Sequence, residues 1–125
     1  MRIRLQNGLP YIAVKLFYRD HCLELDNVLL DTGSAGTVFS IDKLLNIGLE
    51  YAADDAVHRI HGVGGTEFVF SKRLERLAVG DIYVDDFEIE VGAMNYGFEM
   101  DGIVGLDFLL RVGAVIDLGM MEVHV

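Results

Sequence analysis

A carboxylate at the end of an apolar segment is the first feature of the sequence that suggests chemistry. Asp31 follows the run Val28-Leu29-Leu30 and precedes Thr32-Gly33-Ser34. Three large apolar residues without alternation predict a strand that is buried on both faces. A charged side chain at the end of such a strand needs hydrogen bonds, and the N–H and hydroxyl groups of the following turn can supply them. The segment predicts a loop that presents one oriented acid, and a simple Asx turn is the alternative.

A glycine-rich segment lies between two runs that have β-like composition. The runs 57–60 and 67–70 flank His61-Gly62-Val63-Gly64-Gly65-Thr66, which predicts a hairpin whose tip leaves backbone groups open. The spacing is not Gly-x-Gly-x-x-Gly and no helical pattern follows, so a nucleotide-binding loop is excluded. An ordinary hairpin is one interpretation, and a mobile hairpin that closes over a bound peptide is the other.

The second half of the chain repeats the order of the first. Asp101-Gly102-Ile103-Val104-Gly105 again runs from apolar residues into a glycine, and a helical pattern follows. In the first half, we expect Ser40 to cap a short helix through Leu45. Asp107 is interpreted as a first-turn helix residue that interacts with the helix dipole, in preference to a second catalytic acid. The chain therefore contains a weak internal repeat.

The three segments together resemble the aspartic proteases of the single-domain retroviral type and their bacterial relatives. Asp31-Thr32-Gly33-Ser34 resembles that family's active-site loop, the tip Gly62 to Gly65 resembles its flap, and Ile103-Val104-Gly105 resembles its second supporting segment. They stand in the family's order and cover roughly the whole chain. The resemblance implies one domain over residues 1–125, an all-β retropepsin-like barrel with one or two short helices and a pseudo-twofold repeat.

The same resemblance implies the activity of an aspartic endopeptidase. Amide hydrolysis without a metal or cofactor needs an activated water and a proton donor, and two carboxylates that share one proton supply both. The sequence contains one such loop, so the catalytic dyad would need Asp31 from each of two chains on a two-fold axis. The resemblance predicts that Thr32 hydrogen-bonds across this axis, Gly33 lets the backbone approach the substrate, and Ser34 donates to Asp31.

The remaining site residues follow from the resemblance as well. Ile103, Val104 and Gly105 would pass beside the active-site loop and support it. Gly62, Val63, Gly64 and Gly65 would form the flap and bind an extended polypeptide substrate as an added strand. The family's usual interdigitation of terminal strands between two chains would have to use residues 1–5 and 121–125. The alternative function is a homodimeric scaffold or peptide-binding domain of the same fold that cleaves little.

Composition limits the partners. The net charge of −10 argues against nucleic acid and anionic membrane surfaces. With 52% apolar residues and no apolar run of the ~18 residues that a membrane span needs, the surplus apolar surface favours a protein–protein interface. The single cysteine, Cys22, is expected to be a buried small hydrophobe and fits a reducing cytoplasm. His58 and His61 would lie on opposite faces of a strand, so we expect no metal site.

Overall fold

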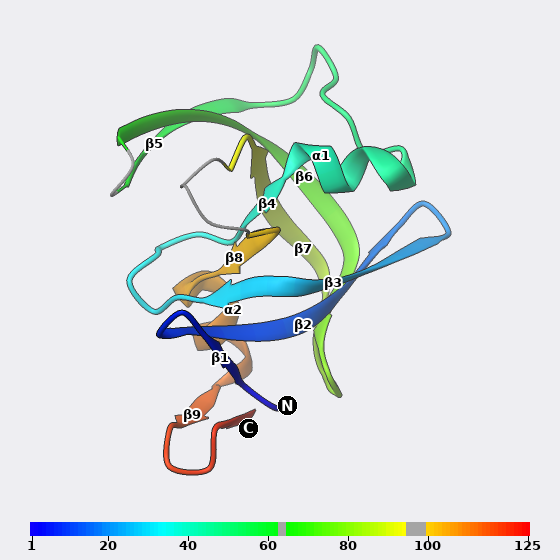
Figure 1. Ribbon diagram of the computed structural model, residues 1–125. Helices are drawn as coiled ribbons and strands as arrows, with labels where there is room; N and C mark the ends of the chain where they lie inside the picture. The colour runs from blue at the N-terminus through cyan, green and yellow to red at the C-terminus, as the bar shows by residue number, and fades with distance from the viewer. Residues whose placement is uncertain (63–64, 95–99) are drawn as a thin grey trace.

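Hydrogen-bonded strands close into a ring in the structure, which is a computed structural model that describes residues 1–62, 65–94 and 100–125 (Figure 1). Around the ring the order is β2, β3, β8, β4, β7 and β6, and pairing between β2 and β6 closes it. The strand β1 adds to the outside of β2, and β5 adds to the outside of β6. The fold is therefore an all-β barrel with short helices, as the resemblance implies.

The elements follow one another along the chain with short connections. The strands are β1 (Arg4–Gln6), β2 (Leu9–Tyr18), β3 (His21–Leu30), β4 (Val38–Ser40), β5 (Val57–Gly62), β6 (Gly65–Val79), β7 (Ile82–Gly92), β8 (Gly102–Val104), β9 (Val115–Asp117) and β10 (Glu122–His124). The helices are α1 (Ile41–Leu44), the 3₁₀ turn η1 (Leu45–Ile47) and α2 (Leu106–Val112). The expected helix after Ser40 is present, but the Ser40 side chain makes no capping hydrogen bond, so that part of the prediction was wrong. The turn η1 that continues α1 ends at Gly48, whose φ of 75° is typical of a helix C-terminus.

The barrel interior is filled by alternating apolar side chains. On β2 the alternating buried residues are Ile12, Val14, Leu16 and Tyr18, and Tyr11 is buried as well. The helix α2 packs on this core through Phe108, whose ring meets that of Phe87 edge to face at a centroid distance of 5.7 Å. The core thus fixes α2 against β7.

The strand that leads into the acid loop lies in the middle of the sheet. Parallel pairing joins β3 to β8, with Leu29 opposite Ile103 and Leu30 opposite Val104. Val28 and Leu30 are buried, and Leu29 is half-buried. The predicted burial of this segment is therefore confirmed, and the two halves of the predicted repeat lie side by side.

Cys22 does not have the predicted burial. It is a free, exposed cysteine near the start of β3. In this part of the strand the inward positions are Leu23 and Leu25, so Cys22 and Glu24 face outward. The prediction was wrong because it used the residue type and ignored the strand's alternation.

The two ends of the chain pair with each other. The Ile3 N–H donates to the carbonyl of Met121 at 2.8 Å, and the Val123 N–H donates to the carbonyl of Met1 at 2.7 Å. Arg2 forms an antiparallel bridge with Glu122 between these contacts. Segments that were candidates for interdigitation between two chains therefore pair within one chain.

Candidate active site

The loop that carries Asp31 begins where β3 leaves the barrel. The Asp31 N–H donates to the carbonyl of Val104 at 3.0 Å, which joins the loop to the end of β8. The Gly33 N–H donates to Oδ1 of Asp31 at 2.9 Å, and the Ser34 N–H donates to the Asp31 carbonyl at 3.2 Å. The turn thus orients the carboxylate with backbone groups and leaves the side chain half-exposed.

The hydroxyl of Ser34 does not have the predicted partner. Its Oγ donates to the carbonyl of Gly36 at 2.7 Å, within the same loop. Because a hydroxyl has one proton to donate, the expected bond from Ser34 to the Asp31 carboxylate is absent from this arrangement. The backbone N–H of Gly33 takes that role.

The first turn of α2 is held by the acid loop. The Leu106 N–H donates to the carbonyl of Ser34 at 2.8 Å, and the Asp107 N–H donates to that of Ala35 at 3.3 Å. The first N–H groups of a helix have no acceptor inside the helix, and the residue before α2, Gly105, supplies no side-chain cap. The loop carbonyls therefore cap α2, and α2 fixes the path of the loop.

Gly105 lies where the two backbones approach most closely. A Cβ atom at this position would meet the carbonyl oxygen of Gly36 and would lie 2.7 Å from that of Ser34. Both neighbours are backbone atoms, so no side-chain rotation can relieve the contact. This is the physical reason for a glycine after Ile103-Val104, a segment that the sequence predicts to support the loop and that the structure places beside it.

Asp107 has a role that the sequence analysis missed. Its carboxylate accepts the Thr37 N–H at 3.1 Å through Oδ2 and the Thr37 hydroxyl at 2.7 Å through Oδ1. The Thr37 hydroxyl also accepts the Gly105 N–H at 3.1 Å, and Thr37 is completely buried. Asp107 lies in the first turn of α2 as predicted, but its side chain joins the helix to the end of the acid loop. The one sequence feature that could have indicated this role is an acidic residue two positions after Gly105.

The predicted flap is in part described. The strands β5 and β6 form an antiparallel hairpin that extends to the pair Gly62 and Gly65. The hairpin prediction is therefore confirmed up to these residues. Val63 and Gly64, the predicted tip, lie outside the described residues.

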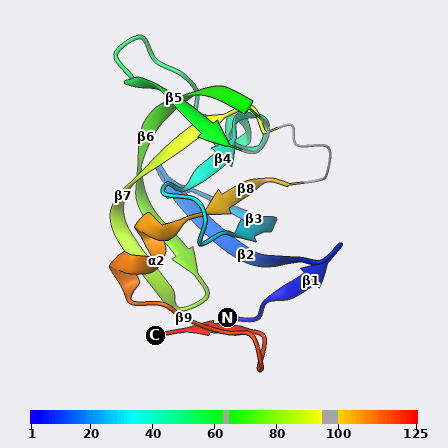
Figure 2. The same ribbon diagram turned by 90° about the vertical axis from the view of Figure 1, so that its left-hand side faces the viewer.

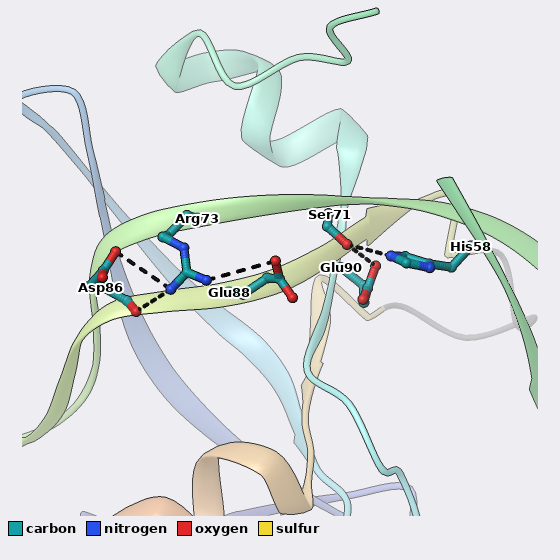
Figure 3. A network of polar contacts seen from close by, with 6 residues as sticks. All are labelled: His58, Ser71, Arg73, Asp86, Glu88 and Glu90. Carbon is teal, nitrogen blue, oxygen red and sulfur yellow. Dashed lines mark hydrogen bonds and ion pairs between the residues drawn. The ribbon is translucent and has the colours of Figure 1, made fainter. Parts of the chain in front are cut away.

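A chain of polar contacts links the base of this hairpin to the strand beside the acid loop (Figure 3). Oγ of Ser71 lies 2.8 Å from Nε2 of His58 and donates to Oε2 of Glu90 at 3.1 Å. Since the single hydroxyl proton goes to Glu90, Nε2 of His58 is the donor toward Ser71. The Glu90 N–H in turn donates to the carbonyl of Thr37 at 2.9 Å. The serine, and not the histidine, stands in the middle, so this arrangement is not a nucleophilic triad.

Burial raises the pKa of Glu90, and the negative charges of Glu88 and Asp107 act in the same direction. The hydrogen bond from Ser71 and the nearby His58 oppose this shift. Farther along the same strands, Arg73 lies 3.6 Å from Asp86 and 3.9 Å from Glu88, in exposed ion pairs (Figure 3). The carboxylate of Glu90 is therefore more buried than those of Asp86 and Glu88, which are exposed to solvent.

Among the described residues, no group of three or more His, Cys, Asp or Glu side chains is arranged to hold a metal ion. In the same residues, no helix has the length and apolar character to cross a membrane.

Comparison with known families agrees with this geometry. The model of the aspartyl protease family matches residues 24–108, from β3 through the hairpin to the first turn of α2. The match includes the acid loop and the segment that supports it, and it spans more than half of the 125 residues. The chain therefore belongs to the aspartyl protease family. A comparison with curated protein sequences gives no match.

Proposed function

We propose that this chain is a homodimeric aspartic endopeptidase in which Asp31 from each of two copies forms the catalytic dyad. The observation that carries the proposal is the hydrogen bonding of the two oxygens of the Asp31 carboxylate. Oδ1 accepts the Gly33 N–H, and Oδ2 accepts no hydrogen bond from any side chain or backbone group in the described residues. An oriented acid with one free oxygen at the mouth of a rigid loop is half of a dyad, and family membership supports the other half coming from a second copy.

The chemistry follows from two carboxyl groups that share one proton. The ionised member takes a proton from a water molecule, whose oxygen attacks the carbonyl carbon of the scissile peptide bond. The protonated member donates to the carbonyl oxygen, which gives a neutral tetrahedral diol. Transfer of a proton to the amide nitrogen then allows the C–N bond to break, which releases the carboxylic acid and amine products. No cofactor takes part in this sequence.

The hairpin β5–β6 suits the role of flap over an extended polypeptide. It lies next to the barrel strand β7, and a glycine-rich tip would leave backbone groups available for an added strand. Thr32 is exposed in the acid loop, where it would meet its counterpart across the two-fold axis. We place the enzyme in the cytoplasm, because its single cysteine is exposed and has no second cysteine in the chain to pair with.

The test compares cleavage of an unfolded protein mixture by the wild type and by Asp31→Asn across about pH 3.5–7. We expect the substitution to reduce cleavage by about a hundredfold or more, because proton transfer by the dyad is lost. Asp20→Asn is the matched control. It lies in an exposed turn at φ 66°, a conformation that asparagine adopts readily, so its activity should equal that of the wild type.

Mixing the two proteins tests whether the acids act as a pair. In an equimolar mixture of wild type and Asp31→Asn that has exchanged subunits, about one quarter of the dimers carry two aspartates. We expect activity near one quarter of that of the wild type at the same total concentration. A value of one half would mean that each chain acts alone. Peptide binding without cleavage at any pH would assign the chain to the non-catalytic alternative.

A further inference from the structure

The terminal strands form a small sheet with one unpaired edge. Residues 1–3 pair with β10, and β10 pairs with β9. Among the described residues, no strand pairs with the other side of β9. In Figure 1, β9 lies to the left of both chain ends, so its free edge points away from the N-terminal segment.

The hydrogen-bond pattern identifies which groups lie on this edge. Both the N–H and the C=O of Val123 bond to Met1 at 2.7 Å, so they point away from β9. Val123 lies opposite Ile116 in the ladder. Residues of an antiparallel pair alternate between bonding toward and away from each other, so the backbone groups of Ile116 point to the free edge.

The free edge has the composition of a surface that pairs. Val115 is 47% exposed, and at the turn that follows β9 the exposed fractions of Leu118 and Met120 are 67% and 63%. Natural edge strands are commonly protected by proline, by lysine or by a covering element. The strand β9 is only three residues long and carries one charged residue, Asp117, whereas Val115 and Ile116 offer neither proline nor lysine. The backbone groups of Ile116 are therefore open to a second strand.

The edge also lies on the same side of the molecule as the acid loop. The cyan loop between β3 and β4 and the strand β9 both lie on the left of Figure 1, the side that faces the viewer in Figure 2. One two-fold axis on this side can therefore relate both features to their counterparts in a second copy. An interface on any other side would leave the two acid loops apart.

We propose that two copies of the chain join by antiparallel pairing of β9 with β9, centred on Ile116. This inference rests on the proposed function for the need of a second copy, and it adds where the copies meet. In this arrangement each Ile116 exchanges its N–H···O=C bonds with Ile116 of the partner subunit. The sheet then continues from residues 1–3 through both β9 strands to the partner's N-terminal segment.

The pairing fixes the neighbours of each side chain. With Ile116 on the axis, Val115 lies opposite Asp117 of the partner subunit, and the contact occurs twice by symmetry. Like charges directly opposite each other in a sheet destabilise it, and opposite charges stabilise it. The valine position can therefore be used to weaken or to strengthen the interface by charge alone.

The first experiment measures the dimer dissociation constant of Val115→Asp and Val115→Lys by sedimentation velocity. We expect the dimer dissociation constant of Val115→Asp to be about tenfold larger than that of Val115→Lys, since two unfavourable charge pairs replace two favourable ones. The control pair is Leu45→Asp and Leu45→Lys, at a position 50% exposed in η1, which makes the same change in net charge. Thermal unfolding confirms that all four variants fold. Equal dissociation of the two Val115 variants would overturn the proposal.

The second experiment uses a cross-link on the axis. Directly opposite residues of a hydrogen-bonded antiparallel pair have Cα atoms ~5.5 Å apart, a spacing that a disulfide bridges. In a Cys22→Ser background, Ile116→Cys should form a covalent dimer under mild oxidation, whereas Leu45→Cys should stay monomeric on a denaturing gel. Equal cross-linking of both variants, or none at Ile116, would contradict pairing at this edge.

The two proposals fail in different ways. A dimer that weakens with Val115→Asp yet cleaves nothing would support this interface and reject the protease. Cleavage that depends on concentration but responds equally to the two Val115 substitutions would support the protease and reject this interface. A wild type that stays monomeric at every concentration would reject the interface.

Discussion

Asp107 and Thr37 are joined by two hydrogen bonds across seventy residues of sequence. Thr37 donates both its N–H, at 3.1 Å, and its hydroxyl, at 2.7 Å, to the carboxylate. The same hydroxyl accepts the Gly105 N–H, so one buried side chain bonds two groups, the Asp107 carboxylate and the Gly105 N–H. Together with the loop carbonyls that cap α2, this arrangement joins the end of the acid loop to the helix.

Replacing Thr37 by valine tests this relationship. Thr37→Val keeps the shape but leaves the Gly105 N–H without its acceptor, so we expect a loss of about 1–3 kcal/mol in the free energy of unfolding. Thr37→Ser keeps the hydroxyl and should lose less. Urea denaturation of both variants measures the difference. Equal stability of the valine and serine variants would show that the hydroxyl contributes nothing.

Gly105 and Gly36, whose backbones approach each other closely, should respond differently to substitution by alanine. Gly105→Ala places a Cβ against backbone carbonyls of the loop, at 2.7 Å from that of Ser34, so the loop or α2 must move. We expect a loss of about 1–3 kcal/mol or more and a sharp loss of peptide cleavage. Gly36→Ala meets no atom within 4 Å and is the control. Comparable unfolding midpoints for the two variants would contradict the close approach.

The ion pair of Lys72 and Asp55 should make stability depend on pH. Nζ of Lys72 lies 2.8 Å from Oδ2 of Asp55, and the hydrogen bond from this lysine, with one from the Ala52 N–H, lowers the pKa of Asp55. The folded chain therefore holds the ionised form more strongly than the unfolded chain does. This stabilisation is present above the ordinary aspartate pKa and is lost as the pH falls below it.

Thermal unfolding of Asp55→Asn at two pH values measures this contribution. We expect the variant to melt below the wild type at pH 7 and the difference to shrink toward about pH 3, below the ordinary aspartate pKa. The exposed neighbour gives the control Asp54→Asn, which should melt like the wild type at both values. A difference between Asp55→Asn and wild type that is constant with pH would rule out the ionised carboxylate as its cause.

The titration of Glu90 should change stability with pH in the opposite direction to that of Asp55. Burial raises its pKa, so the folded chain takes up a proton at a higher pH than the unfolded chain, and stability falls as the pH rises through that range. Glu90→Gln keeps an acceptor for Ser71 and removes the charge. We expect the variant to be more stable than the wild type at pH 7, with the advantage lost at acid pH. Glu88→Gln, on the same strand but exposed, is the control for thermal melts.

The sequence predicts local features of the fold well. The strand into Asp31, the hairpin up to Gly62 and Gly65, and the helix after Gly105 are all present where local composition places them. Each depends on residues that are neighbours in the chain, such as a glycine at positive φ or an alternating apolar pattern. The barrel class follows from these elements together with the resemblance.

Contacts between distant segments were beyond prediction. The bonds of Asp107 to Thr37 and of Met1 to Val123 depend on how the barrel closes, which no local pattern encodes. The Ser34 hydroxyl was assigned to Asp31 by resemblance, whereas a nearer acceptor, the Gly36 carbonyl, takes its proton. Local composition thus identified the acid, and the tertiary structure determined what orients it.

The distance along the chain between the acid loop and its supports has a consequence for biosynthesis. Thr37 meets Asp107 across 70 positions, and β3 lies directly beside β8. Contacts between distant segments form slowly, because closing the long loop between them costs entropy before the contact stabilises the fold. A nascent chain on the ribosome therefore carries Asp31 long before it has the segment that holds it, so synthesis itself delays the appearance of an ordered acid loop until the last quarter of the protein has emerged.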